Sequence, residues 1–440
     1  MAQVNREIGI TTRYFPNYEA LEDAFRLRIA TLLPRKHAGT DRFWQDFQRL
    51  LHAPPEGRAQ RAEHYITSNP RDCLAFGTPR QVLKAALMTA APSTASRSLD
   101  VDTMAARFGL LTHLNQPVHS LSGGETVRLA LAKAFVTAAR ADRLTLASPF
   151  SWLSLNNRRF FNELARHCRD LDTPMEVFAL EGEDSMTAAA PLPDAPGGPM
   201  VRIFFHKAGV VLSSLLDGLQ NRRLRAAFAD VDLKLRSPCL VRGDNGQGKS
   251  LLAKVLAGAA SREGTVGLET EGQRGRVRLL LQDLVNQTMM RTFRQIAEGT
   301  HAEADLTTHG LYDAIRDDML ASNVLDGDEI CSFADRWASG KPASLLELKV
   351  LLAAVRLVGK PAAIILDEPD WGLRQASALV LVSGIIRVAH RYGVAVWLIS
   401  HKPWWRNRAG SFLQIHKTSP RAEDAAEDLF RIQIKRMTVP

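Results

Sequence analysis

A glycine-rich segment in the second half of the chain has the residue types and spacing of a phosphate-binding loop. After a short apolar strand expected at 239–241, the chain reads GDNGQGKSL over 243–251, and an apolar, helix-periodic segment follows. Glycines let the backbone turn its N–H groups toward phosphate oxygens, and the start of a helix adds positive potential. Lys249 is expected to reach the terminal phosphates, and the Ser250 hydroxyl to bind Mg²⁺. The predicted phosphate-binding residues are Gly243, Asp244, Asn245, Gly246, Gln247, Gly248, Lys249, Ser250 and Leu251.

Two acidic residues follow a strongly apolar segment later in the chain. The residues at 363–366 predict a parallel strand buried on both faces, and it ends in Asp367 and Glu368. A carboxylate in this position beside a phosphate loop can hold Mg²⁺, often through water, which is the role expected of Asp367. Glu368 would polarise an attacking water molecule, as general base or as an orienting group.

Two further predicted strands end in polar side chains. Gln282 follows the apolar residues 277–281, and His401 follows those at 394–400. We expect Gln282 to contact Mg²⁺ and the attacking water, and His401 to hydrogen-bond a γ-phosphate oxygen or the same water. Glu368, His401 and Gln282 are therefore the predicted catalytic residues. Ser250, Gln282 and Asp367 are the predicted metal site.

In the order GDNGQGKS, Gln282, Asp367-Glu368-Pro369 and His401, the chain resembles the ATP-binding-cassette ATPases, and LSGGE at 121–125 matches their signature motif. The resemblance implies ATP and Mg²⁺ as ligands and ATP hydrolysis as the activity. It also implies an α/β fold, in which each cassette has a mostly parallel sheet with flanking helices, an antiparallel β portion and an inserted helical subdomain. The signature residues would begin a helix whose N-terminus grips the γ-phosphate held by another cassette; they are Ser122, Gly123, Gly124 and Glu125.

The order of the motifs predicts two cassettes in tandem. LSGGE precedes the phosphate loop, whereas in a single cassette of this family it lies between the glutamine and the acidic strand. An ungapped offset of 220 residues supports a repeat, because it places Ala147-Ser148-Pro149 on Asp367-Glu368-Pro369 and Glu181 on His401.

The first cassette has lost most of the chemistry that the second retains. Segment 29–51 is interpreted as a strand, a degraded phosphate loop and a helix, with Gly39 kept and Thr40 in place of the lysine. After the strand expected at 64–67, Ser68 stands in place of a glutamine.

The second cassette's own signature is degraded in turn. The corresponding segment, 337–349, reads WASGKPASLLELK. The 220-residue offset uses Pro342-Ala343-Ser344, and a small gap would instead use Ser339-Gly340. In both registers the second glycine and the acidic or amide residue are missing. Arg374 stands where an aspartate is usual in this family, which could alter communication between the two sites.

Cassettes of this family dimerise head to tail, and each nucleotide lies between one cassette's phosphate loop and the other's signature. We therefore expect one working site, in which the phosphate loop, carboxylates and histidine of the second cassette face LSGGE of the first. The opposite site would pair 35–41 with the segment near Pro342 and should not catalyse.

Length and composition place the chain among cytoplasmic globular proteins. It has 440 residues, 45% hydrophobic and 23% charged, which suggests two or three domains. The four cysteines form no CxxC pair, the N-terminus has no secretory pattern, and no apolar run could span a bilayer. The predicted domains are 1–182 and 201–440, joined by a flexible linker at 183–200, with helical insertions at 75–130 and 285–350.

What the hydrolysis drives stays open between two interpretations. One is a soluble ATPase acting on a partner protein or complex, such as a ribosome, a nucleic acid or an enzyme complex; the net charge of +9 mildly favours it, although no motif indicates nucleic acid. The other is the ATP-binding subunit of a membrane transporter, peripheral at the inner face, with a groove near 284–294 for a separate membrane-spanning chain. Trp404 and Trp405 fit a partner surface or a core equally well. The aromatic that stacks on adenine could be Phe204, Phe205 or Phe228.

Overall fold

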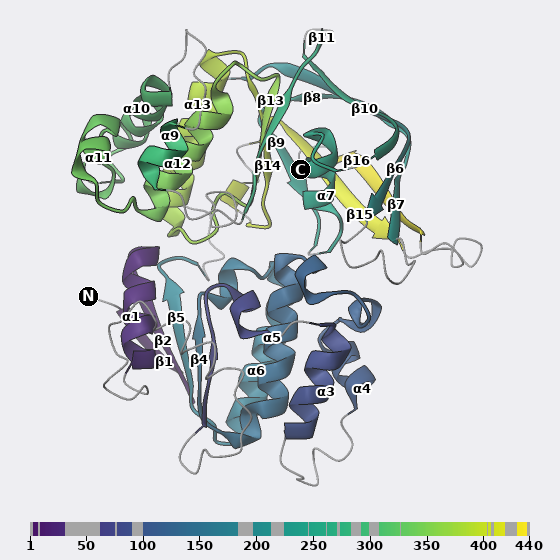
Figure 1. Cartoon of the computed structure of the whole chain (residues 1–440), viewed down its shortest axis with the longest axis vertical. Helices are drawn as coiled ribbons and strands as arrows, with labels where there is room; N and C mark the ends of the chain where they lie inside the picture. The colour runs from purple at the N-terminus through teal and green to yellow at the C-terminus, as the bar shows by residue number, and fades with distance from the viewer. Residues whose placement is uncertain are drawn as a thin grey trace. The chain divides into compact units, whose positions relative to one another are not determined.

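The computed structural model divides the chain into two units, Met1–Ser185 and Met186–Pro440, and each is described here by itself (Figure 1). The boundary falls inside the segment 183–200, most of which lies outside the described residues. The structure describes residues 3–7, 9–30, 62–74, 77–89, 100–183, 197–212, 224–244, 246–260, 262–270, 273–282, 292–298, 308–325, 327–402, 404–405, 409–418 and 429–437.

A five-stranded sheet forms the centre of the first unit, in the order β1-β2-β5-β4-β3. Strands β2, β5, β4 and β3 run parallel, and β1 closes one edge antiparallel to β2. β5 is buried along its whole length, as expected of a parallel strand covered on both faces. The strands are β1 (Gln3–Glu7), β2 (Ile10–Phe15), β3 (Ala62–Ile66), β4 (Ala141–Ala147) and β5 (Met175–Leu180).

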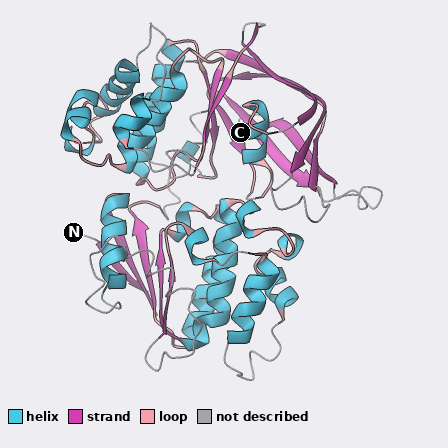
Figure 2. Cartoon of the chain, in the orientation of Figure 1, coloured by secondary structure: helices cyan, strands magenta, loops and turns pink. Residues whose placement is uncertain are grey.

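Helices cover both faces of this sheet, α1 on one and α5 with α6 on the other (Figure 2). Helix α1 buries Leu21 and Phe25 against Phe15 and Phe178 of the strands. Helices α3 and α4 lie between β3 and α5 along the chain, within the range predicted as a helical insertion. The helices are α1 (Tyr18–Ala30), α3 (Pro79–Thr89), α4 (Val101–Arg107), α5 (Gly123–Thr137) and α6 (Arg158–Asp170).

The second unit has a larger mixed sheet in the order β11-β10-β6-β7-β16-β15-β9-β14-β13-β12, with β8 paired to β6. Strands β12, β13, β14, β9 and β15 form its parallel part. Strands β6, β8, β10 and β11 form its antiparallel part. The strands are β6 (Met200–Leu212), β7 (Leu224–Phe228), β8 (Val231–Arg236), β9 (Cys239–Arg242), β10 (Arg262–Thr270), β11 (Gln273–Arg274), β12 (Val277–Leu280), β13 (Ala363–Asp367), β14 (Ala395–Ile399), β15 (Ser411–Thr418) and β16 (Leu429–Met437).

Among the described residues, helices α9 to α12 come between β12 and β13 and lie in or overlap the insertion predicted at 285–350. Helix α7 follows β9 directly, and α13 joins β13 to β14. Within the described residues, none of the helices has both the length and the apolar character needed to cross a bilayer. The helices are α7 (Lys249–Leu256), α9 (Phe293–Glu298), α10 (Thr308–Leu320), α11 (Phe333–Ser339), α12 (Leu345–Leu357) and α13 (Gln375–Arg391).

Four parallel strands recur in the same spatial and chain order in the two units. β3-β4-β5-β2 of the first unit corresponds to β12-β13-β14-β9 of the second, and β2 and β9 each lead into a helix. The predicted fold class is confirmed: α/β, with parallel strands, an antiparallel portion in the second unit and helical insertions.

This correspondence shows that the phosphate-loop remnant predicted at 29–51 was misplaced. The matching position in the first unit follows β2, at residues 16–17. Ile29 and Ala30, expected to be in a strand, are the last residues of α1, whose buried Leu21 and Phe25 lie at helical spacing. The remainder of that segment, including 35–41 with Gly39 and Thr40, lies outside the described residues.

Candidate functional site

The predicted phosphate loop of the second unit connects β9 to α7 with a backbone that needs glycine. Gly243, Gly246 and Gly248 all have positive φ, at 159°, 82° and 95°. A Cβ on Gly243 would lie 2.9 Å from the carbonyl oxygen of Ile415, and one on Gly248 would lie 2.9 Å from Ile432 Cδ1. The loop therefore has the curled path that turns N–H groups inward. Asn245 lies outside the described residues.

The lysine of the loop is buried and points back at it. Lys249 Nζ donates hydrogen bonds to the carbonyl oxygens of Gly243 and Asp244, at 2.8 and 3.1 Å. When a ligand occupies the loop, its phosphate oxygens can replace these two carbonyl oxygens as acceptors for the Lys249 amine. Gln247 has a structural role, because its Oε1 accepts a 2.6 Å hydrogen bond from the Lys417 N–H on β15. Leu251, in the first turn of α7, is half-buried and packs against the core.

Asp367 ends β13 with a buried carboxylate. Its Oδ1 has no hydrogen-bond partner within the described part of the chain. Burial and the neighbouring Glu368 raise the pKa of Asp367 to about 6, although a hydrogen bond from Ser250 opposes the shift. An orphaned carboxylate oxygen beside a hydroxyl is a donor set of the kind that Mg²⁺ prefers. Ser250 and Asp367 therefore fit the metal predicted for this place.

The three predicted catalytic residues meet at one oxygen atom. His401 Nδ1 lies 3.1 Å from Glu368 Oε2, and Gln282 Nε2 donates to the same oxygen at 3.4 Å. Burial acts to raise the pKa of Glu368, but His401, Lys249 and Lys402 outweigh it and hold that pKa below its usual value. Glu368 is thus an ionised carboxylate that follows β13 and is contacted by side chains that follow the neighbouring strands β12 and β14. Lys402 was not singled out in the sequence, although it directly follows the predicted His401.

The first unit has a turn with the backbone of the Glu368 turn, but it carries Ser148 instead of an acidic residue. Ser148 has φ 47° where Glu368 has 49°, and each donates its N–H to the neighbouring strand, to Phe178 O at 2.7 Å and Ile399 O at 2.8 Å. The match of Ser148 to Glu368 therefore agrees with the 220-residue offset. The residue numbers of Phe178 and Ile399, however, differ by 221, so the first unit has one residue fewer between this turn and β5 than the second unit has before β14. Leu180, rather than Glu181, therefore occupies the place of His401.

The place of the phosphate loop in the first unit is closed. Only Pro16 and Asn17 separate β2 from α1. Polar groups of α1 fill the adjoining space: the Tyr18 hydroxyl lies 2.9 Å from Ser68 Oγ, and Ser68 Oγ donates to the buried Glu22 carboxylate. Ser68 also matches Gln282 in the β3–β4 and β12–β13 ladders. Among the residues that the structure describes, neither a curled loop nor a lysine follows β2 at that position.

The predicted signature of the first unit caps a helix. Ser122 is the N-cap of α5, and its backbone N–H donates to Glu125 Oε2 at 2.8 Å. The Glu125 N–H donates to Ser122 Oγ at 3.4 Å, which completes a capping box. His113 Nε2 lies 3.3 Å from Glu125 Oε1 and fixes the carboxylate from the other side. Gly123 and Gly124 form the first turn and add no side chain of their own beside its N–H groups; Gly123 is half-buried and Gly124 is buried.

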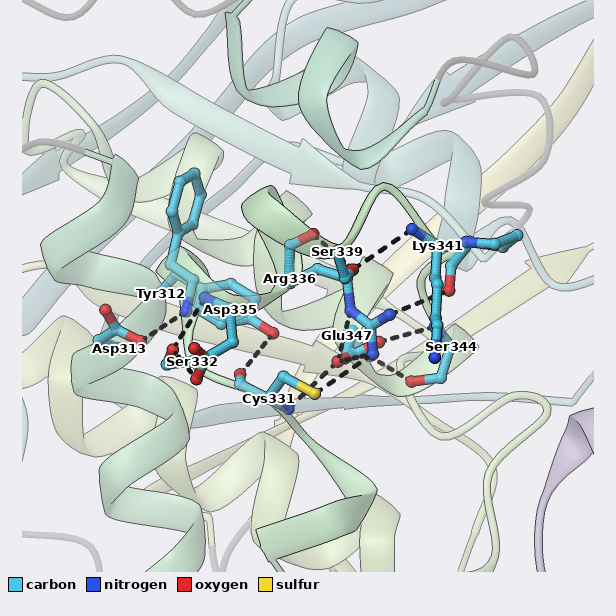
Figure 3. Close-up of polar contacts among 12 residues, drawn as sticks. Tyr312, Asp313, Cys331, Ser332, Asp335, Arg336, Ser339, Lys341, Ser344 and Glu347 are labelled. Atoms are coloured by element: carbon cyan, nitrogen blue, oxygen red, sulfur yellow. Dashed lines mark hydrogen bonds and ion pairs between the residues drawn. The ribbon is translucent and has the colours of Figure 1, made fainter.

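The second unit has the same kind of helix start, with Ser344 and Glu347 drawn in Figure 3. Leu345 and Leu346 stand there in place of the two glycines. Ser344 caps α12 with the dihedral angles of Ser122, φ −65° and ψ 161°, and forms the same capping box with Glu347. The matching register is therefore ASLLE at 343–347, an offset of 222. Both registers considered in the sequence are wrong: Gly340 ends α11 with φ 61°, and the acidic residue is retained as Glu347. What this position lacks is the pair of glycines, which the buried Leu345 and Leu346 replace.

Arg336 is the counter-ion of this helix start. Its Nε and Nη2 donate to Glu347 Oε1 at 2.9 and 2.6 Å, and Glu347 is 1% exposed at its side chain (Figure 3). We predict that Arg336→Met lowers the free energy of unfolding of the second unit by about 3 kcal/mol, because a buried carboxylate loses its partner. Urea unfolding measures this loss. The double variant Arg336→Met/Glu347→Gln should recover most of it, and a double variant as unstable as the sum of the two single variants would contradict the prediction.

The structure also shows where the paired tryptophans, the candidate adenine-stacking aromatics and Arg374 lie. Trp404 and Trp405 are buried, at 5% and 1% exposure, which favours the core rather than a partner surface. Phe205 and Phe228 pack in the main core with ring centroids 5.0 Å apart, and Phe204 lies beneath arginine side chains of the antiparallel part. Arg374 donates two hydrogen bonds from Nη2 to the carboxylate of Glu329, at 2.8 and 2.9 Å. The groove expected near 284–294 lies mostly outside the described residues.

Comparison with known proteins supports the fold. No family model matches the chain. A chain in the crystal structure of archaeal ribosomal stalk protein aP1 with archaeal ribosome recycling factor aABCE1 aligns over 99% of this chain and 90% of its own length, with TM-score 0.52 and 14% identity. A chain in a model of ribosome-bound archaeal Pelota and ABCE1 aligns over 99% of this chain and 76% of its own, with TM-score 0.55 and 15% identity.

A sequence relative matches more locally. It is a protein of Vibrio parahaemolyticus named as an ABC transporter ATP-binding protein, 25% identical over 197 residues. The match covers 42% of this chain and 32% of that relative, so the chain spans about a third of the relative's length. The chain thus has the fold of tandem ATP-binding cassettes and resembles the ATP-binding-cassette ATPases in its motifs.

Proposed function

We propose that this chain, with the fold of tandem ATP-binding cassettes, binds and hydrolyses Mg-ATP at a single composite site. The second unit supplies the phosphate loop, Asp367, Glu368, Gln282 and His401, and the first unit supplies the start of α5 at 122–125. One observation carries the proposal: the losses in the two units are reciprocal. In its described residues the first unit has no phosphate loop after β2 but has glycines at its signature, whereas the second unit has the loop but leucines at its signature.

The chemistry follows from the positions of these groups. Lys249 and the loop N–H groups neutralise the charge that develops on the phosphoryl oxygens, and the N-terminus of α5 adds donors from the opposite side. Glu368 aligns a water molecule for in-line attack, with His401 and Gln282 holding the carboxylate. Bound by Ser250 and Asp367, Mg²⁺ would neutralise part of the charge of the phosphates. Hydrolysis therefore depends on both units closing on one nucleotide.

A direct test is Mg²⁺-dependent phosphate release by the purified full-length chain. Lys249→Ala should lower kcat at least about 100-fold, because the terminal phosphates lose their cation. The exposed Lys435 of β16 provides a matched control, and Lys435→Ala should leave kcat unchanged. A wild-type chain that releases no phosphate above the level of Lys249→Ala would refute the proposed activity.

The work that hydrolysis drives is assigned to a partner protein or complex in the cytoplasm. The archaeal ribosome recycling factor aABCE1, with a similar fold, supports such a role by analogy of fold alone. The alternative is a subunit of a membrane transporter, which the name of the Vibrio relative favours. Affinity purification of Glu368→Gln with ATP from the native host distinguishes them. Recovery of a multi-span membrane protein supports transport, and recovery of a soluble complex supports the first assignment.

A further inference from the structure

Lys349 is a buried charged residue that no part of the proposed chemistry has used. It lies in the second turn of α12, in the sequence LLELKVLLAAV, which has Glu347 as its one other charged residue, and is 1% exposed. An ammonium group inside a protein is costly unless it has partners, so an apolar side chain would serve the packing of this helix better. Its retention here calls for another role.

The amine of Lys349 contacts the turn that carries Glu368. Lys349 Nζ donates a 2.6 Å hydrogen bond to the carbonyl oxygen of Pro369 and lies 5.8 Å from the centroid of the Trp371 ring. Burial lowers the pKa of Lys349 to about 7, while the nearby carboxylates of Asp370 and Glu368 act to raise it. Lys349 therefore connects α12 to the turn that follows β13.

That turn has an unusual backbone which must be held in place. Glu368 has φ 49°, a left-handed conformation that non-glycine residues seldom adopt. Its N–H donates to Ile399 O at 2.8 Å, and the Trp371 N–H donates to Glu368 O at 3.0 Å. The Pro369 carbonyl between these two bonds is fixed by Lys349. The direction of the Glu368 side chain follows from the orientation of this turn.

The charged groups around the turn come from two further elements. Asp370 is buried and accepts a 3.2 Å hydrogen bond from Ser400 Oγ. His401 and Lys402, which follow β14, lower the pKa of Glu368 and act in the same direction on Asp370. With Lys349 from α12, the two carboxylates are surrounded by positively charged or titratable groups.

Comparison within the chain separates this role from helix packing. The register of the two capping boxes places Lys349 opposite Val127 of α5. The first unit retains the proline of the turn as Pro149, but Ser148 replaces Glu368 and Val127 is a buried apolar residue. The lysine is thus present in the unit that has the acidic residue and absent from the unit that lacks it.

We propose that Lys349 is a positioning residue: its hydrogen bond to the Pro369 carbonyl fixes the turn 368–371 and so aims the Glu368 carboxylate at the attacking water. The inference rests on the proposed function. It also makes α12 a direct mechanical link between the degraded signature position of the second unit and its hydrolytic residues.

Lys349→Met tests the role, because methionine keeps the length and removes both donor and charge. We expect kcat for ATP to fall about tenfold or more, and the Kd for ATP, measured in the absence of hydrolysis with Mg²⁺ withheld, to stay within about threefold. The thermal midpoint should stay equal or rise, since a buried charge is removed. Lys341→Met, at an exposed lysine just before α12, is the control and should leave kcat and Kd unchanged.

The outcomes separate this inference from the proposed activity. A folded Lys349→Met chain with kcat within twofold of wild type, while Lys249→Ala is inactive, overturns the role of Lys349 and leaves the activity intact. Equal losses in kcat and in ATP affinity also overturn it, because they indicate damage to binding. A wild-type chain no more active than Lys249→Ala refutes the activity itself. If Lys349→Met does not fold, Lys349→Gln is judged by the same criteria.

Discussion

Ser122→Arg should lower kcat for ATP at least about 100-fold, although Ser122 lies in the unit whose described residues include no phosphate loop after β2. The substitution removes the cap of α5 and places a long side chain over the N–H groups of Gly123 and Gly124. If those groups grip the γ-phosphate held by the second unit, the guanidinium blocks the approach of the two units. Steady-state phosphate release by the full chain measures the effect.

The chain offers a matched control for this variant. Ser344 caps α12 with the same dihedral angles and the same capping box as Ser122. Ser344→Arg therefore costs a similar amount of helix stability, about 1 kcal/mol. We expect its kcat to stay within about twofold of wild type, because buried leucines follow Ser344 and no phosphate loop is expected opposite it. Equal losses in the two variants would attribute the effect to folding and contradict the composite site.

Glu368→Gln should abolish most hydrolysis while ATP binding remains. The amide keeps the size of the side chain but cannot accept a proton or orient water as the ionised carboxylate does, so kcat should fall about 100-fold to 10,000-fold. ATP should then hold the chain in its closed state. Rapid-quench measurement of bound ATP and ADP distinguishes slow chemistry from slow product release. Ser148→Ala, at the corresponding turn of the first unit, is the control and should leave kcat unchanged.

The residues with direct chemistry were accessible from the sequence because chemistry limits their choice. Glycines with positive φ, a lysine at the helix start and carboxylates at a strand end cannot be exchanged freely. The structure brings Gln282, Glu368 and His401, each of which follows a predicted strand, together at one oxygen atom. LSGGE was equally recognisable because serine and glutamate complete a capping box around two glycines that begin the helix.

The positions that correspond to the phosphate loop and to the second signature were misread because their sequences lack the family pattern. Only Pro16 and Asn17 separate β2 from α1, so nothing in the sequence marks that position, and the prediction fell on 29–51 instead. A single ungapped offset also cannot follow small insertions. An offset of 220 residues aligns Ser148 with Glu368, whereas an offset of 222 aligns Ser122 with Ser344 at the start of α12. Backbone angles and hydrogen bonds identify these positions where residue identities do not.

Contacts between distant elements were the second class of feature that the sequence concealed. Lys349 could be noticed as a lysine in an apolar helix, but its acceptor on Pro369 depends on how α12 packs beside β13. Arg336 and Glu347 are 11 residues apart, with a loop between them, and only the path of that loop makes them partners. Such pairs follow from tertiary packing, which periodicity does not describe.

In the proposed composite site, the two units together hold one nucleotide. This is tested most directly by incubating the Glu368→Gln chain with Mg²⁺ and ATP, passing it rapidly through a gel-filtration column and counting the nucleotides that each chain retains. The reciprocal losses predict one retained ATP per chain. Adding Ser122→Arg should lead to rapid loss of that ATP, whereas adding Ser344→Arg should not. Two nucleotides per chain, or one that dissociates equally slowly with Ser122→Arg, would contradict a single site closed by the two units.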